Sequence, residues 1–332
     1  MSKVKIGLIA CGKIATCHHV PEVLKLEKRA EITALFDLKK SNATKLKKEL
    51  LPDSKIYDSV EDLLGADVDA VIISTPNNSH CELTLQALKA GKHVLVEKPM
   101  AVNLKDADKM IAAAKAAGLH LQVNQSLRFS PVYIKIKELI DSGIIGSPMH
   151  IRCIRAGSSS PDKGWSPGAK WFVSKEFAGG IVRDLAVHMS DMRAGYFGDV
   201  SSISSLNRTL AKDCEVTDNV SALMGFANGA TGVLELSWTT TPGTGYLEIY
   251  GSKGAIRLGF APGGAIEVCT DGKKFVKRKP RKAKTSQAWF IDGVKGKPGV
   301  PTPEEIGRKA LAYCEAILAS GEKNKPVAPA IK

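Results

Sequence analysis

Short apolar runs of strand length alternate with segments of helical period along the first part of the chain. The first run, Val4 to Ala10, is followed by a glycine-containing turn and a helical segment. A further helix is expected over 130–143. Apolar strands that alternate with helices predict a parallel sheet covered by helices on both faces. The strand-like runs span residues 4–10, 31–37, 68–75, 93–99 and 119–125.

The pattern changes after about Met149, where strand-like runs follow one another with turn residues between them. One helical segment, near Ile181 to Phe197, interrupts these runs, and another is expected from Pro303 to Ser320. Strands without intervening helices favour an antiparallel sheet, so this part of the chain is expected to be α+β. The expected strands span residues 150–157, 202–210, 219–229, 231–240, 246–251 and 255–260.

Length and composition are those of a globular protein of about two domains. The chain has 332 residues, of which 44% are hydrophobic and 24% are charged, and about 150 residues is a common domain size. We expect an α/β domain over 1–125, a helical connector over 130–143 and an α+β domain over 146–332. No apolar run reaches the roughly 18 residues of a membrane helix. Because a strand rather than a leader opens the sequence, we expect a soluble, cytoplasmic protein with no membrane partner.

Cysteine spacing and charge bear on whether the protein binds a metal or a nucleic acid. The seven cysteines include no C-x-x-C pair and match no metal-binding spacing, so we expect reduced thiols and no metal. The net charge is +13, and basic residues are densest from Lys273 to Lys284. This segment has a single aromatic residue and no recognisable nucleic-acid module around it. We interpret it as a solvated surface rather than a nucleic-acid site.

The loop after the first strand has the pattern of a dinucleotide-binding turn. It matches G-x-G-x-x-[GA], with Ala10 at the first glycine position and Gly12 at the second. Such a turn lets the backbone and a helix N-terminus approach a pyrophosphate, and the methyl group of Ala10 narrows it only slightly. Asp37 ends the second strand and favours NAD, although Lys39 and Lys40 leave NADP possible. The residues expected to hold the phosphates are Ala10, Cys11, Gly12, Lys13 and Ile14.

Three further motifs add to this loop. They are Ser74-Thr75-Pro76-Asn77, Glu97-Lys98-Pro99 and the segment GGIVRDLAVH over 179–188. In this order and spacing the sequence resembles the glucose–fructose oxidoreductase and inositol dehydrogenase (Gfo/Idh/MocA) family. The resemblance implies an N-terminal Rossmann domain and a C-terminal α+β domain whose open sheet often forms homodimers or homotetramers. It also implies hydride transfer between NAD(P) and a hydroxyl of a sugar, cyclitol or related polyol.

The resemblance assigns roles to individual residues. Lys98 corresponds to the lysine near the nicotinamide ribose and the reacting hydroxyl, and Asp184 with His188 to the substrate-facing acid and histidine. The residues Asp184 and His188 are four apart on a predicted helix, so both can face one ligand. A histidine suits proton transfer near neutral pH, and a lysine can stabilise a developing alkoxide. The resemblance also places Ser74, Thr75, Asn77, His80 and Glu97 in the cofactor cleft, with Gln125 and Arg128 at the nicotinamide end.

The substrate pocket is open to several interpretations. Trp165 and Trp171 precede the catalytic helix, where they could stack on a sugar or nicotinamide or simply pack in the domain core. Arg128 and Arg183 could anchor a phosphorylated or carboxylated substrate. Where the family commonly has a third glycine, this chain has Ile181. The alternative function is a catalytically silent, NAD-sensing regulatory protein, which would have no need of proton-transfer groups.

Overall fold

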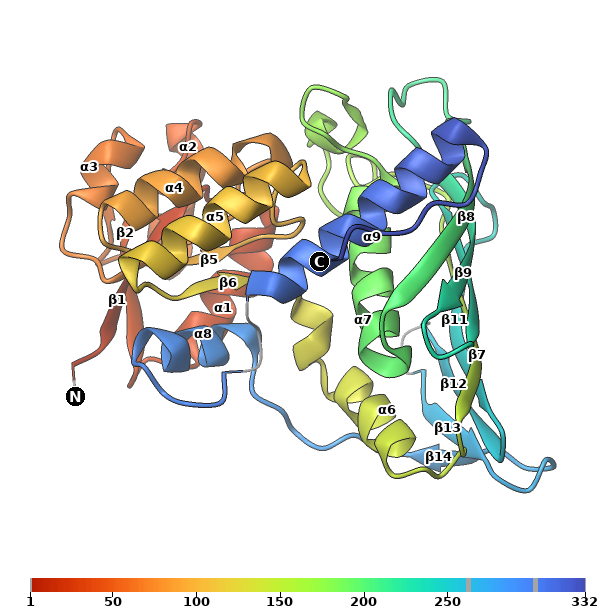
Figure 1. Cartoon of the computed structure of the whole chain (residues 1–332). Coiled ribbons are helices and arrows are strands. Elements are labelled where there is room, and N and C mark those ends of the chain that lie inside the picture. The colour runs from red at the N-terminus through yellow and green to blue at the C-terminus, as the bar shows by residue number, and fades with distance from the viewer. Residues whose placement is uncertain (1, 261–263, 301–303, 332) are drawn as a thin grey trace. The chain divides into compact units, whose positions relative to one another are not determined.

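The computed structural model describes residues 2–260, 264–300 and 304–331, which fold into two compact units (Figure 1). The first unit consists of the residues up to Ser126 together with a second segment, from Lys284 to Arg308. The second unit runs from Leu127 to Ala283 and resumes at Lys309. The expected division assigned 284–308 to the second domain, whereas these residues pack in the first unit.

A parallel sheet forms the centre of the first unit. Its strand order among the described residues is β3-β2-β1-β4-β5-β6, and every pair of neighbours is parallel. The side chains of β1, β4 and β5 are almost all buried, which explains the near-continuous apolar runs in the sequence. The strands are β1 (Val4–Ile9), β2 (Ala30–Phe36), β3 (Lys55–Ile56), β4 (Ala70–Ile73), β5 (His93–Val96) and β6 (Leu121–Val123).

Helices cover both faces of this sheet, and α4 and α5 are seen side by side on one of them (Figure 1). On the other face, Phe290 and Ile291 of α8 share a core with Val20 and Val23 of α1. A π-helical turn, Ala15–His19, leads into α1. The helices are α1 (Val20–Leu24), α2 (Lys40–Leu50), α3 (Val60–Leu64), α4 (His80–Lys89), α5 (Leu104–Ala117) and α8 (Ser286–Val294).

A salt bridge from a buried carboxylate of α8 to Arg29 holds the helix against the rest of the first unit, and two lysines of the same segment add to the pairing. Asp292 is 2% exposed and accepts Arg29 at 2.6 Å, Lys284 at 2.9 Å and Lys297 at 2.9 Å. Burial alone would raise the pKa of Asp292, but hydrogen bonds from the two lysines and the charge of Arg29 lower it to about 2. Residues 284–308 therefore belong to the first unit through polar contacts as well as through the apolar core.

The second unit is a mostly antiparallel sheet covered on one face. Its order among the described residues is β14-β13-β12-β11-β7-β10-β9-β8, and only the β7–β10 pair is parallel. Helices α6, α7 and α9 contribute to the core on one face of it. The strands are β7 (Pro148–Ala156), β8 (Val200–Arg208), β9 (Asn219–Phe226), β10 (Thr231–Ser237), β11 (Thr244–Gly251), β12 (Gly254–Gly259), β13 (Ile266–Cys269) and β14 (Val276–Arg278). The helices are α6 (Pro131–Asp141), α7 (Val187–Phe197) and α9 (Glu304–Lys323).

The expected fold class, a Rossmann domain followed by an α+β domain with a mostly antiparallel sheet, is confirmed. The sequence pattern did not predict β3, α3, β13, β14 or α8. Pro303, the expected start of the last helix, lies outside the described residues, and α9 begins at Glu304. The basic segment from Lys273 contains β14, an edge strand of the second sheet. Lysine-rich edge strands resist pairing with other chains, which gives this charge a structural reason.

Candidate functional site

The loop after β1 lies at the switch point of the parallel sheet. Strand β1 is flanked by β2 and β4, so the connections leave it in opposite directions and open a crevice at its carboxyl end. Two loops meet there, because the Ser74 hydroxyl after β4 donates to the Ala10 carbonyl at 2.9 Å. The crevice is the usual dinucleotide site of this topology.

Ala10 adopts a left-handed backbone conformation, with φ of 74°. Its amide donates to the Phe36 carbonyl at 2.8 Å, so the turn is fixed to the end of β2. Glycine takes this conformation without strain, whereas alanine carries a Cβ clash that costs about 1 kcal/mol. Ala10 in place of glycine therefore strains the backbone of the turn. The sequence suggested instead that its methyl group narrows the turn.

Gly12 has an ordinary backbone conformation and open space around it. A Cβ built at this position meets no described atom within 4 Å. Its carbonyl accepts the Thr16 amide at 3.0 Å and the Thr16 hydroxyl at 2.9 Å, which begins the helical segment. Packing within the protein therefore gives no reason for a glycine here. The close approach of a bound pyrophosphate would require a glycine here. Because the space beside Gly12 is open, the loop fits a dinucleotide.

Asp37 is held by three hydrogen bonds at the end of β2. Its carboxylate accepts the Cys11 amide at 2.8 Å, the Lys39 amide at 2.8 Å and the Asn42 side chain at 3.2 Å. A carboxylate accepts about four hydrogen bonds, so capacity remains for a ribose hydroxyl. The nearby Lys40 is paired with Asp58 at 2.6 Å. This arrangement favours the adenosine ribose of NAD over a 2′-phosphate.

The Cys11 thiol is buried against the same carboxylate. Burial, reinforced by the charge of Asp37, raises the pKa of Cys11 to about 12. The thiolate is the reactive form of cysteine, so this side chain is inert at physiological pH. Cys11 contributes its backbone to the loop, not its sulfur chemistry.

His80, at the start of α4, joins two loops through its ring. Its Nδ1 contacts the Pro99 carbonyl at 2.8 Å and its Nε2 contacts the Thr75 carbonyl at 3.0 Å. The side chain is completely buried, and burial lowers its pKa. The resemblance placed His80 in the cofactor cleft, but these contacts give it the geometry of a residue that positions the Glu97-Lys98-Pro99 turn. Asn77, in the same loop, is also buried.

Glu97 is a buried carboxylate with partners on both of its oxygens. It is 7% exposed, and Oε1 accepts His19 at 3.0 Å and Asn124 at 2.6 Å, while Oε2 accepts the Lys98 amide at 3.1 Å. Burial would raise the pKa of Glu97, but the hydrogen bond and charge of His19 and the charge of Lys98 lower it to about 2. Glu97 is therefore ionised, and it anchors the turn that carries Lys98.

Lys98 itself is half-buried, between the buried residues Glu97 and Pro99. The Lys98–Pro99 peptide bond is cis. The backbone of Lys98 is held by its amide, which donates to Glu97 Oε2 at 3.1 Å. The structure therefore places Lys98 in a defined position at the carboxyl end of β5, the edge of the sheet where ligands bind in this topology.

The second unit positions Asp184 and His188 through a pair of glycines. A Cβ at Gly179 would lie 2.3 Å from the Phe172 carbonyl oxygen, and Gly180 has φ of 103°. Glycine is thus required at both positions, and the chain turns there into a π-helical segment, Val182–Ala186, and then into α7. π-Helical turns inside helices often occur at functional sites.

Asp184 and His188 lie on the part of this helix that the core leaves accessible. Both side chains are half-buried, whereas residues 186, 187 and 189–193 are buried. The two residues therefore share one strip, as their spacing predicted. Lys98 belongs to the first unit and this pair to the second, so their convergence on one substrate stays a prediction.

Several expected substrate residues have partners of their own. Arg128 donates to Asp191 through Nε at 2.7 Å and through an NH2 group at 2.7 Å, which fixes the start of α6 to α7. Burial raises the pKa of Asp191, although the charge of Arg128 opposes this. Because its guanidinium is engaged by this carboxylate, Arg128 is better suited to position α7 than to anchor an anionic substrate.

The aromatic residues before the glycines form a small cluster. Trp171 stacks on Phe172 with ring centroids 3.7 Å apart, and Trp165 meets the same ring edge-on at 5.7 Å. Trp165 is 45% exposed. Trp171 therefore packs within the protein, while stacking of Trp165 on a sugar or nicotinamide stays a prediction. Gln125, after β6, is buried, and both of its amide atoms lack a partner among the described residues.

Sequence reasoning missed three residues of the site: His19, Asn124 and Gln287. His19 was noted only as one of two adjacent histidines, and its contact with Gln287 spans 268 positions. No local signal predicts such a contact. Within the described residues there is no cluster of His, Cys, Asp or Glu suited to a metal and no helix long and apolar enough to cross a membrane.

Comparisons with known proteins agree with this geometry. A model described as an oxidoreductase family with an NAD-binding Rossmann fold matches residues 4–125, and one for the GFO/IDH/MocA C-terminal domain matches residues 133–257. Myo-inositol 2-dehydrogenase of Thermotoga maritima is 31% identical over 259 residues, 76% of this chain and 74% of that protein. The 1,5-anhydro-D-fructose reductase of Ensifer adhaerens is 34% identical over 206 residues, 61% of this chain and 60% of that protein.

Among solved structures, an NAD-binding protein from Listeria innocua superposes with a TM-score of 0.87 at 26% identity. The match covers all of this chain and 98% of that one. The fold of this chain therefore recurs in that protein over nearly the whole of both chains. With its NAD-binding Rossmann unit and its matching C-terminal domain, the chain belongs to the Gfo/Idh/MocA family of oxidoreductases.

Proposed function

We propose that the protein transfers hydride between NAD and a hydroxyl or carbonyl carbon of a sugar, cyclitol or related polyol. The observation that carries this proposal is the placement of Lys98. Its turn is fixed by the buried Glu97 and by His80, at the sheet edge that also bears the glycine loop. A nucleotide-binding protein without catalysis would have no need to hold a lysine in this way.

The chain's own residues have the groups that alcohol oxidation needs. When bound, the nicotinamide would accept hydride from the carbinol carbon. We assign His188 to take the hydroxyl proton and Lys98 to stabilise the charge on the oxygen. Asp184, on the same strip of the helix, assists by orienting His188 or the substrate. In the reverse direction the same groups return the proton to the carbonyl oxygen.

The substrate class rests on the chemistry of the site and on the relatives. The named relatives act on myo-inositol and on an anhydrosugar, both polyhydroxylated rings. Trp165 offers an exposed indole face of the kind that stacks on sugar rings. Arg183, beside Asp184, is the remaining candidate anchor for an anionic group on the substrate.

A cofactor and substrate screen tests the proposal. Purified protein is incubated with NAD or NADP and with inositols, aldoses, sugar acids and glycosides, and reduced cofactor is followed by absorbance. We expect turnover with NAD that Lys98→Ala abolishes and that Lys105→Ala, a change at an exposed lysine of α5, preserves. Full activity of Lys98→Ala would refute the role of this residue.

The alternative, a catalytically silent NAD sensor, makes a different prediction in the same screen. It requires NAD to raise the melting temperature while no polyol gives turnover and no polyol changes NAD affinity. The presence of Lys98, Asp184 and His188 together favours the enzyme.

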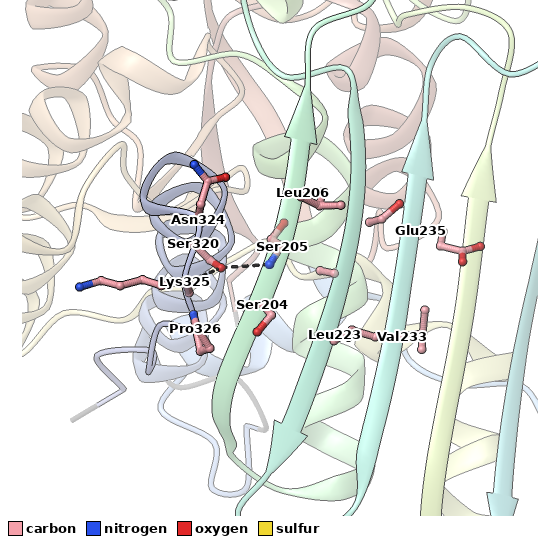
Figure 2. Close-up of a pocket in the computed structure, with 12 residues that line it drawn as sticks. Ser204, Ser205, Leu206, Leu223, Val233, Glu235, Ser320, Asn324, Lys325 and Pro326 are labelled. Carbon is pink, nitrogen blue, oxygen red and sulfur yellow. Dashed lines mark hydrogen bonds between the residues drawn. The ribbon is translucent and has the colours of Figure 1, made fainter.

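We also propose that the second unit mediates self-association through the outer face of its sheet. Leu206 and Leu223 are 58% and 61% exposed there, beside Val233 and Glu235 (Figure 2). A hollow of 380 Å³ is lined by these residues and by the segment after α9. Exposed apolar patches of this kind mark interaction sites. Sedimentation of the native protein should show a dimer or tetramer, and Leu223→Glu should shift it toward the monomer without lowering thermal stability.

A further inference from the structure

A chain of buried polar side chains connects α8 to the turn that carries Lys98. Gln287, in the first turn of α8, contacts His19 Nδ1 through its Nε2 at 3.0 Å. His19 Nε2 contacts Glu97 Oε1 at 3.0 Å, and Glu97 Oε2 accepts the Lys98 amide at 3.1 Å. The chain therefore runs from side chain to side chain and ends on the backbone of the proposed catalytic lysine.

Every link in this chain is shielded from water. Gln287 is 1% exposed, His19 is 0% exposed and Glu97 is 7% exposed. A buried polar group that loses its partner destabilises the fold, so each residue constrains the next. In this geometry both ring nitrogens of His19 are engaged, Nδ1 by the Gln287 amide and Nε2 by the Glu97 carboxylate.

The charges around Glu97 come from several elements. His19 and His18 lie on the turn before α1, His80 on α4 and Lys98 on the turn after β5, and the charge of Glu97 acts on all of them. Among these groups, His19 also contacts the carboxylate directly, through Nε2 at 3.0 Å.

We propose that Gln287 and His19 are positioning residues for Lys98. They hold the Glu97 carboxylate in one orientation, and Glu97 in turn holds the backbone amide of the lysine. This inference rests on the proposed function, in which Lys98 contacts the reacting oxygen. It assigns α8, a helix outside the recognised nucleotide-binding motifs, a part in setting the reactivity of the site.

The position of α8 suits this role. Asp292 ties it to Arg29, Lys284 and Lys297, and the Gln122 side chain donates to Ser286 at 3.0 Å. Gln287 is thus presented to His19 from a helix that is itself fixed at both ends. The side chain that directs His19 comes from the segment that returns to the first unit after the second sheet is complete.

Three variants separate positioning from simple packing. Gln287→Glu keeps the shape of the side chain and places a carboxylate against Nδ1, which favours a doubly protonated His19. Gln287→Met keeps the bulk and removes the hydrogen bond. Ser286→Ala is the matched control, because it loosens the same turn of α8 through Gln122 without touching the chain from Gln287 to Lys98.

The first readout needs no substrate. Nitrogen-15 NMR of the histidine rings reports how each ring nitrogen of His19 is hydrogen-bonded, and the Lys98 side-chain Cε signal, assigned with Lys98→Arg, reports the surroundings of the lysine. In Gln287→Met we expect the His19 Nδ1 signal and the Lys98 Cε signal both to move, because the ring loses its partner and no longer holds Glu97 in one orientation. Ser286→Ala should leave both signals in place.

The second readout uses whichever polyol the screen identifies. We expect Gln287→Met to lower kcat about tenfold with little change in NAD affinity, and Ser286→Ala to stay within about twofold of the native value. The pH profile of kcat should move in Gln287→Glu. If neither the Lys98 Cε signal nor the pH profile differs from that of Ser286→Ala, the contacts from Gln287 to Glu97 are only structural and the inference is wrong. If no polyol is turned over, the NMR arm decides the inference alone, so its failure and that of the proposed function are distinct.

Discussion

A single added methyl group at Gly12 should separate the fold of the protein from its cofactor binding. The Cβ of Gly12→Ala meets no described atom within 4 Å, and the backbone there does not need a positive φ. Replacing glycine by alanine at such a position reduces the entropy of the unfolded chain and stabilises the fold by about 0.5 kcal/mol. Without NAD, the variant should therefore melt at the same temperature as the native protein or slightly above it.

With NAD bound, Gly12→Ala should melt at a lower temperature than the native protein. A methyl group where the backbone approaches the pyrophosphate costs at least about 1.4 kcal/mol of binding, a tenfold loss of affinity. At a cofactor concentration 100 times the native Kd, binding stabilises the native protein by about 2.7 kcal/mol, and the variant by only about 1.4 kcal/mol. The NAD-induced rise in melting temperature should then shrink by about 2 °C.

Thermal melts with and without NAD test this crossover, with affinity measured by titration calorimetry. Gly259→Ala is the matched control, because its Cβ also meets nothing within 4 Å and it lies at the end of β12 in the other unit. The control should keep the full response to NAD. If Gly12→Ala kept it too, the loop would not be the place where the pyrophosphate meets the backbone. A loss of more than about 1 kcal/mol without NAD would refute the open space around Gly12.

Three other substitutions test the remaining backbone and charge features. Gly179→Ala should lower the unfolding free energy by about 3 kcal/mol in urea melts, because its Cβ would lie 2.3 Å from the Phe172 carbonyl oxygen, and a stable variant would contradict this. Ala10→Gly should raise the melting temperature by relieving about 1 kcal/mol of strain at a φ of 74°, and an unchanged value would mean the strain is absent. Asp292→Asn should cost about 2 kcal/mol at pH 7. Since the folded pKa of Asp292 is lowered to about 2, that difference should be present above pH 4 and vanish as the pH falls from about 4 to about 2, whereas a pH-independent difference would refute the assignment.

The sequence predicted those parts of the fold that depend on local patterns. Strands β1 and β4 are buried on both faces and read as apolar runs, and the turn at Gly12 has its own signature. Helix α3 was missed although Ser59 caps it by accepting the Asp62 amide at 3.0 Å, a spacing visible in the sequence. Strand β3 has two residues, too few for any alternation to show.

The parts of the site that could not be predicted depend on tertiary contacts. Nothing near His19 in the sequence indicates that Glu97 and Gln287 surround its ring. The bidentate pairing of Arg128 with Asp191 likewise joins residues 63 positions apart. A motif identifies which residue types are present, whereas the partner that engages each one is decided by packing across the fold.

The return of residues 284–308 to the first unit sets the order in which this protein can be completed during synthesis. The ribosome must add roughly 180 residues after Ser126 before Arg308 emerges, which takes roughly 10–40 s at typical rates. Throughout that interval Arg29, His19 and Gln122 lack the partners that α8 supplies. The nucleotide-binding unit is begun first and finished only after the second sheet has been synthesised. A chain cut or stalled between the two segments should therefore expose an unfinished apolar face to chaperones and proteases.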